Sequence, residues 1–279
     1  MDTLDRMELA DIGHPRKMAE GVLNQIPAIT YPIPIDEIAL ALGIRRIEDF
    51  PTEDFEGALL ANESKSNCAI LVRAGIRDTR RRFTVGHELG HYLMPLHFPS
   101  AEGFRCSSSD MKSEDRPGLV GRPQWEAQAN TFSSELLMPR VEFKRRLRKL
   151  NGASIEALIA LSDDFGVSKT AAGRKLLELA DDPCAMILAK RGRVEQVYRG
   201  SEFPFIQLKK GLPMPRGSTA YFEAASTADI SEVEEADQCQ WLSSEKSEVE
   251  LFEQTLVQAD GWTLTLLTAE IDEEDEGSK

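Results

Sequence analysis

Two histidines four positions apart, with a glutamate after the first, are the residues whose types and spacing best suit chemistry: His87, Glu88 and His91. On an α-helix, positions i and i+4 lie on the same face. Both imidazoles can therefore point at a single Zn²⁺, and the glutamate beside them can take a proton from water. Such a match also arises by chance in about one in a hundred sequences of this kind, so the surrounding residues must support it.

A catalytic zinc site usually has three protein ligands and one position left for water. His14, near the N-terminus, and His97, just past the helix, are expected to be surface or local structural residues. Glu126 is the expected third ligand, because an antiparallel second helix would bring its carboxylate under the imidazoles. Asn130, four residues later on the same face, could accept the outer N–H of a liganding histidine. The alternative is that Glu126 and Asn130 are ordinary surface residues of their helix.

The predicted active-site helix runs from Asp78 to about Met94 and surrounds the histidines with apolar residues. Gly86 and Gly90 would each weaken this helix by about 1 kcal/mol relative to alanine. Two glycines beside the histidines indicate close approach of another backbone. A slightly weak helix without such a neighbour is the alternative.

Strands are predicted before this helix, around residues 44–47, 57–61 and 68–73. The polar segment 98–122, rich in Ser, Gly and Pro, is predicted to be a loop, and a second helix follows at 124–138. An exposed edge of the third strand could bind substrate as an added β-strand. An internal strand without a free edge is equally compatible with the pattern.

Residues 139–180 are predicted to form short helices with a glycine-containing turn, the helix-turn-helix pattern. Plain packing is a commoner reason for this pattern than DNA binding. Further along, 184–199 is a predicted hairpin, while 218–225 and 262–266 alternate like strands. The acidic stretch 232–253 is predicted to be partly helical.

Composition places the chain among ordinary globular proteins. It has 279 residues, 41% of them hydrophobic and 29% charged, which is enough for a core and more than one domain. No apolar run approaches the ~20 residues that span a bilayer. The N-terminus lacks the features of a signal peptide, so we expect a cytoplasmic protein without a membrane partner.

The net charge of -14 is unevenly distributed, with -6 in residues 1–139, +4 in 140–180 and -12 in 181–279. Binding of nucleic acid by the whole chain is disfavoured, because phosphate neutralisation needs a positive face. Only the basic middle segment could supply one, so DNA is a possible but not a favoured partner.

The cysteines are far apart in the sequence and are expected to be reduced thiols rather than a disulfide framework. Cys106 lies between the two helices that carry the candidate ligands. It could occupy the open zinc position and inhibit the enzyme, or be a free structural thiol.

Two stretches carry a family resemblance: R-F-T-V-G-H-E-L-G-H-Y-L at 82–93 and W-E-A-Q-A-N-T-F-S-S-E-L-L-M-P at 125–139. Together they resemble the ImmA/IrrE family of metallo-endopeptidases, strongly over about residues 36–139. The resemblance continues more loosely through F-G-V-S-K-T-A-A-G-R-K-L-L-E-L at 165–179. One departure is Ser133, where an alanine is usual.

The resemblance implies that His87, His91 and Glu126 are zinc ligands and that Glu88 is the catalytic glutamate. It also implies limited proteolysis of an Xre-type helix-turn-helix repressor, often encoded next to the peptidase. Cleavage relieves repression after a stress or mobile-element signal. Some relatives carry a GAF-like sensor near the C-terminus, and residues 184–270 could be a module of that kind.

The expected fold class is α+β. We expect a zincin-like metallopeptidase domain at 1–139, a helical, helix-turn-helix-like segment at 140–181, a small α/β, possibly sensor-like, domain at 182–271 and an acidic tail at 272–279.

The expected function is that of a zinc-dependent endopeptidase acting on a repressor protein, although Mn²⁺ also suits a His₂Glu ligand set. The alternative is a DNA-binding or sensor-type transcriptional regulator with a metal site but no peptidase activity. The donor to the oxyanion cannot be assigned from the sequence. Tyr92 is the nearest candidate, but packing is its expected role.

Overall fold

The computed structural model describes most of the chain, namely residues 3–62, 64–98, 103–112, 118–222, 229–242 and 249–271. The chain forms two compact units, Met1–Glu142 with Ser162–Ser168, and Phe143–Leu161 with Lys169–Lys279. Residues 140–181, expected as a segment of their own, are divided between these units. The expected α+β class is confirmed. In the described part of the chain, no helix has the length and apolar character needed to cross a membrane.

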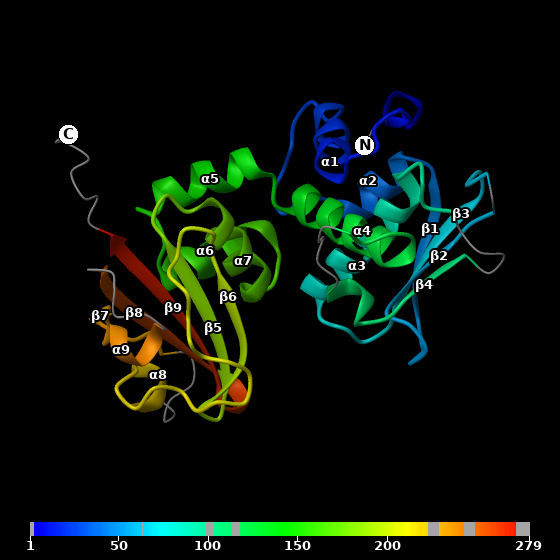
Figure 1. The fold of residues 1–279 in the computed structure, drawn as a ribbon. Coiled ribbons are helices and arrows are strands. Elements are labelled where there is room, and N and C mark those ends of the chain that lie inside the picture. Colours follow the sequence, from blue (N-terminus) through cyan, green and yellow to red (C-terminus); the bar gives the residue numbers. More distant parts are fainter. Residues whose placement is uncertain are drawn as a thin grey trace. The chain divides into compact units, whose positions relative to one another are not determined.

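The first unit contains a four-stranded sheet in the order β1-β3-β2-β4 (Figure 1). Its strands are β1 (Ile44–Phe50), β2 (Gly57–Leu60), β3 (Cys68–Arg73) and β4 (Phe104–Cys106). β1 runs parallel to β3, and the other pairs are antiparallel.

The position of β3 decides between two alternatives. β3 is hydrogen-bonded to β1 on one side and to β2 on the other, so it is an internal strand without a free edge for substrate. The outer strands of the described sheet are β1 and β4. β4 lies inside the segment 98–122, which was predicted to be a loop. The strand could not be predicted from the sequence because three residues are too few to show an alternating pattern.

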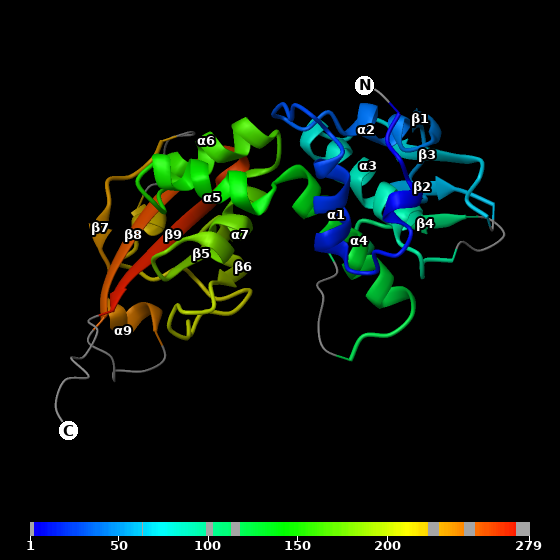
Figure 2. The same ribbon diagram turned by 90° about the horizontal axis from the view of Figure 1, so that it is seen from above.

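Helices pack on this sheet and on one another, and those at 78–94 and 124–138 were predicted from the sequence. The helices are α1 (Pro15–Asn24), α2 (Ile35–Ala41), α3 (Asp78–Leu93) and α4 (Arg122–Leu137), with short 3₁₀ turns at Met7–Leu9 and Asp110–Lys112. α3 packs on β2 and β3 and also against α4, and Figure 2 shows α4 beside α3. Every residue of α3 from 84 to 93 is buried, because the sheet and α4 cover both of its faces.

A buried lysine closes the C-terminal end of α3. The Lys65 ammonium donates hydrogen bonds to the carbonyl oxygens of His91, Tyr92 and Met94 at 2.7, 3.2 and 3.0 Å. The last carbonyls of a helix have no partner within the helix, and a cation there also compensates the helix dipole. Lys65 therefore stabilises the C-terminal end of α3, next to His91.

Residues 162–168, the end of α6 (Ile155–Phe165) and the turn after it, belong to the first unit. Arg82 of α3 donates from Nε to the carbonyl oxygen of Gly166 at 3.1 Å. The ring of Phe165 meets that of Tyr31 edge-on, with centroids 5.2 Å apart. This turn therefore holds the first half of α3.

The second unit is built on a five-stranded antiparallel sheet in the order β6-β5-β9-β8-β7. Its strands are β5 (Cys184–Lys190), β6 (Arg193–Arg199), β7 (Glu234–Glu235), β8 (Val249–Gln258) and β9 (Trp262–Ile271). The predicted hairpin is confirmed as β5–β6. Arg191 and Gly192 at its turn both have positive φ, 51° and 72°, as a type I′ turn requires.

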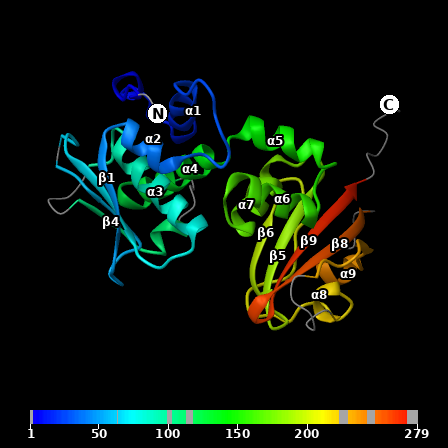
Figure 3. The ribbon, with the colours of Figure 1, turned by 180° about the vertical axis from the view of Figure 1, so that it is seen from behind.

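The two faces of this sheet have different covers, because alternate residues of a strand point to opposite sides. Ala185 and Ile187 of β5 belong to a core that includes Trp241 and Phe203. Met186 faces the other side, where its sulfur meets Gly173 of α7 (Lys169–Leu179). Figure 3 shows α6 and α7 over β5 and β6, while α5 (Arg140–Lys149) precedes them in the chain.

One C-terminal prediction is corrected, and the partial helix expected at 232–253 is present. Thr219–Phe222 is the helix α8 rather than part of a strand, and residues 223–228 lie outside the described part. The stretch expected to be partly helical contains the short helix α9 (Gln238–Trp241), but from Val249 it forms the long strand β8. The predicted strand at 262–266 is confirmed within β9. The expected acidic tail, 272–279, lies outside the described residues.

Replacing Lys65 by methionine should destabilise the first unit by about 1–3 kcal/mol, because the buried carbonyls lose their donor while the apolar stem is kept. Urea denaturation followed by circular dichroism measures the change. Lys17→Met, at an exposed position of α1, is the control and should leave the midpoint unchanged. Equal midpoints for the two variants would show that the cap contributes nothing.

Candidate metal centre

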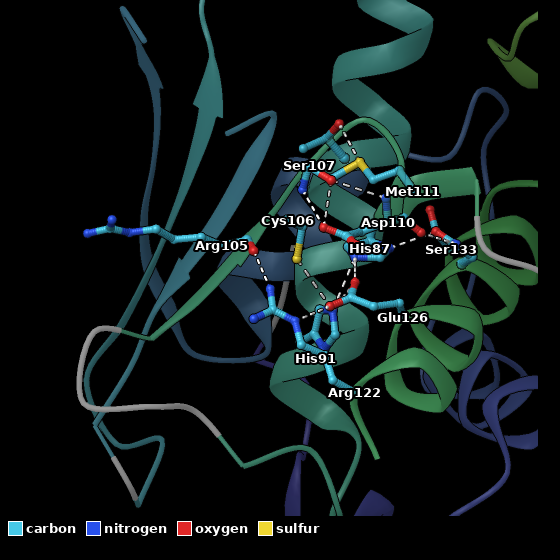
Figure 4. Close-up of polar contacts among 12 residues, drawn as sticks. His87, His91, Arg105, Cys106, Ser107, Asp110, Met111, Arg122, Glu126 and Ser133 are labelled. Atoms are coloured by element: carbon cyan, nitrogen blue, oxygen red, sulfur yellow. Dashed lines mark hydrogen bonds and ion pairs between the residues drawn. The ribbon is translucent and has the colours of Figure 1, made fainter. Parts of the chain in front are cut away.

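Three ligand atoms from α3 and α4 meet inside the first unit (Figure 4). The Nε2 atoms of His87 and His91 are 3.1 Å apart. Oε2 of Glu126 lies 3.2 Å from the first and 3.3 Å from the second. The side chains of both histidines are fully buried and that of Glu126 is 2% exposed. The structure thus brings together the three residues that the sequence singles out.

The close approach of α3 and α4 depends on the two glycines of α3. A Cβ on Gly90 would lie 3.1 Å from the Cα of Ala129, and one on Gly86 would lie 2.5 Å from Oγ of Ser133. Gly86 of α3 lies beside Ser133 of α4, and Gly90 lies beside Ala129. Residue numbers thus rise along α3 where they fall along α4, so the two helices are antiparallel. The backbone approach predicted from the glycines is therefore confirmed, and it places the Glu126 carboxylate against the imidazoles.

Asn130 lies beside His87 as the helical spacing suggested. Its Oδ1 is 2.8 Å from Nδ1 of His87, and its Nδ2 donates to the carbonyl oxygen of Asp110 at 2.9 Å. Because the amide nitrogen is used by Asp110, the amide oxygen must accept from His87, which then carries its proton on Nδ1. This tautomer leaves the Nε2 lone pair free for a metal.

His97 has a larger part in the site than the sequence indicated. It is fully buried, and its Nδ1 lies 3.0 Å from Nδ1 of His91. Its Nε2 lies 2.9 Å from Oε1 of Gln128, which can only accept. His97 therefore carries its proton on Nε2 and accepts from Nδ1–H of His91, so the Nε2 lone pair of His91 is also free. His14, in contrast, is exposed at the start of α1.

Sequence reasoning missed the link to His97 for a physical reason. Six positions separate it from His91, and Pro95 lies between them, so no helical periodicity connects the two. Arg122 was also missed, although a signal exists. It precedes Glu126 by one helical turn, and its Nε lies 3.3 Å from Oε1 of that carboxylate.

Glu88 is fully buried, and within the described part of the chain neither of its carboxylate oxygens has a hydrogen-bond partner. Burial raises the pKa of Glu88 to about 7. Gly57 of β2 makes room for this side chain, since a Cβ there would lie 2.5 Å from Oε1 of Glu88.

Tyr92 points away from these ligands. Its hydroxyl donates to the carbonyl oxygen of Leu42 at 3.2 Å and accepts from Arg6 at 3.0 Å. The Arg6 guanidinium also lies over the ring, 4.2 Å from its centroid. Packing, the expected role of Tyr92, agrees with these contacts.

Cys106 of β4 faces the same three ligands. Its sulfur is 3.6 Å from Nε2 of His91, and the four potential ligand atoms lie within 4.8 Å of one another. The side chain is fully buried, and burial raises the pKa of the Cys106 thiol far above its ordinary value. Cys106 is thus part of the candidate site rather than of the loop around it.

Two histidines one helical turn apart and a carboxylate from a second helix form a donor set that could hold a metal ion, with a buried glutamate beside them. Residues 41–177 match the family model Peptidase_M78, described as the IrrE N-terminal-like domain, and this segment of the chain belongs to that family. The match confirms the resemblance to ImmA/IrrE proteins and extends through most of α7.

Comparisons with curated proteins and with solved structures add to the family match. No curated protein gives a significant match to the chain. Among solved structures, a Mycobacterium tuberculosis transcriptional regulator is similar, with a TM-score of 0.58 and 15% sequence identity. The alignment covers 94% of this chain and 80% of the regulator. At this identity the comparison shows a shared fold.

The contact between Gly86 and Ser133 can be tested by a double-mutant cycle. Gly86→Ala alone should be strained, since the new methyl group meets Oγ of Ser133, while Ser133→Ala removes that atom. We expect a favourable coupling of at least about 1 kcal/mol between the two substitutions, measured by urea denaturation. Gly13→Ala, whose Cβ meets no atom within 4 Å, should be additive with Ser133→Ala. Additivity in both cycles would contradict the strain.

Proposed function

We propose that this protein is a zinc-dependent endopeptidase that cleaves a transcriptional repressor of helix-turn-helix type at a specific site. The observation that carries the proposal is the convergence of His87, His91 and Glu126 next to the buried, unpartnered carboxylate of Glu88. The Peptidase_M78 match supports the metallopeptidase part of this proposal.

The donor set fits a zinc ion in both chemistry and spacing. Zinc prefers nitrogen and oxygen ligands at about 2.0–2.2 Å in tetrahedral arrangement, which separates the ligand atoms by about 3.4 Å. The distances among His87, His91 and Glu126 are 3.1–3.3 Å. The hydrogen bonds of Asn130 and His97 leave both Nε2 lone pairs pointing at the same spot. Mn²⁺ would accept the same ligands.

A bound zinc ion would supply Lewis acidity, polarising the scissile carbonyl and acidifying water. Glu88 has the position and the environment of a general base in this scheme. As a carboxylate, Glu88 can take a proton from the attacking water and return it to the leaving amine. No N–H or O–H group of the described residues donates to its oxygens, and the Cys106 thiol lies against it.

The substrate would bind along an edge of the sheet. β4 is an outer strand, and it carries Phe104, whose ring stacks on His91 with centroids 4.4 Å apart. A peptide added to this strand would have its backbone fixed beside the ligands. The strand that we propose to pair with the substrate is therefore β4 rather than β3.

The choice of a helix-turn-helix repressor as substrate rests on the resemblance to ImmA/IrrE proteins, with relief of repression in a stress or mobile-element response as the outcome. The rival is a regulator that keeps a metal but does not cleave peptides. The solved relative, whose title is that of a transcriptional regulator, favours keeping this second candidate.

Glu88→Gln separates the two candidates. The amide keeps the shape of the side chain but cannot accept a proton, so cleavage of the repressor encoded nearby should fall by at least about 100-fold. The products are followed by gel electrophoresis and mass spectrometry, with chelator-treated wild type as a second negative control. Metal content, measured by elemental analysis, should stay at the wild-type level.

Regulation that survives Glu88→Gln in cells, with metal still bound, would exclude the peptidase and favour the rival. A matched control is Glu8→Gln, which changes an exposed glutamate of the same unit and should leave cleavage unchanged.

His97→Phe should weaken metal binding by about 10–100-fold, the usual effect of losing an outer partner of a ligating histidine. Phenylalanine keeps the ring contact with Trp125 but cannot accept the N–H of His91. Competition with a chromogenic chelator measures the affinity. His14→Phe, at an exposed position, should leave it unchanged, and equal affinities for the two variants would contradict the role given to His97.

A further inference from the structure

Cys106 Sγ completes a set of four ligand atoms around one point, and this cluster is the only one of its kind in the described part of the chain. We propose that Cys106 is the fourth metal ligand in the resting protein, so that the site is closed and the peptidase is latent. This inference rests on the proposed metal-dependent function.

The sulfur–nitrogen distance at His91 is that of a tetrahedral site, and the four ligand atoms all lie within 4.8 Å of one another. With a zinc–sulfur bond of about 2.3 Å and zinc–nitrogen bonds of about 2.1 Å, sulfur and nitrogen lie about 3.6 Å apart. Sγ of Cys106 is 3.6 Å from Nε2 of His91. Figure 4 shows this sulfur directed toward His91 and Glu126 from the strand opposite the two helices.

The backbone holds the sulfur in place. Cys106 pairs with Gly57 across the antiparallel β2–β4 ladder, and its side chain is fully buried. Sγ is therefore held beside the other three ligand atoms. The other buried cysteines, Cys68 and Cys184, belong to no cluster of potential ligands among the described residues.

Binding of a metal ion by Cys106 exchanges the thiol proton for the metal. The S–H bond breaks, the proton leaves to solvent, and a metal–sulfur bond forms; release of the sulfur takes up one proton again. Sites with four protein ligands are structural, whereas hydrolysis needs one position for water. The thiolate and the attacking water therefore compete for the same position.

Release of the sulfur would require β4 to shift. β4 is three residues long, and in the described sheet it pairs only with β2. Such a shift would withdraw Cys106, and it would break the stack of Phe104 on His91 and the hydrogen bond that Arg122 of α4 donates to the Arg105 carbonyl. The three-ligand form, ready for water, arises once these contacts open.

Cobalt reports directly on the sulfur ligand. Full-length protein loaded with Co²⁺ should show a near-ultraviolet sulfur-to-cobalt charge-transfer band together with the visible bands of four-coordinate cobalt. The charge-transfer band should disappear in Cys106→Ala, while the visible bands persist. Cys68→Ala, the same truncation at another buried thiol, should keep both.

Two further measurements use the same variants. The zinc dissociation constant, from chelator competition, should rise at least about tenfold in Cys106→Ala. Cleavage by the zinc-loaded variant should exceed that of wild type, because water gains the fourth position. Circular dichroism confirms that each variant is folded, and the wild-type spectrum decides the question even where a variant does not fold.

The outcomes distinguish this inference from the proposed function. Wild type that binds Co²⁺ through the visible bands but lacks the charge-transfer band would overturn the role of Cys106 and leave the metallopeptidase intact. A charge-transfer band that survives Cys106→Ala would also overturn it. Wild type that binds no Co²⁺ at all would overturn both proposals.

Discussion

The first unit depends on one constraint. Four ionisable side chains are buried at one point, namely those of His87, Glu88, His91 and Glu126. Polar groups removed from water must find partners within the protein, and unpaired charges are strongly unfavourable. His87 and His91 satisfy this through Asn130 and through His97. These contacts require α3 and α4 to be in register and close, which the glycines of α3 permit. Glu88, without a partner among the described residues, is the exception, and reactive groups are often such exceptions.

Much of the site could be predicted from the sequence because its residues recur at helical spacing. The i, i+4 spacing of His87 and His91 and that of Glu126 and Asn130 place each pair on one helix face, whatever surrounds them. Two glycines next to the histidines indicated a close neighbour without naming it. The same local rules located α3, α4, the first three strands and the β5–β6 hairpin.

The remaining features depend on contacts between distant parts of the chain. The internal position of β3 follows from its pairing with both β1 and β2, which no local pattern records. β8 was obscured by its acidic residues. Glu253 is buried within it, where its Oε1 accepts a hydrogen bond from the backbone of Thr219, so composition alone suggested a solvated segment. His97 and Cys106 reach the ligands only through the tertiary fold.

The assignment of residues 162–168 to the first unit has a consequence for synthesis of the chain. Domains usually fold in order as they leave the ribosome. Here α3 emerges long before Gly166, the residue whose carbonyl holds Arg82, and before Phe165, which packs on Tyr31. The ribosome must first complete α5 and α6. The N-terminal unit therefore lacks these contacts during translation until part of the second unit has been made.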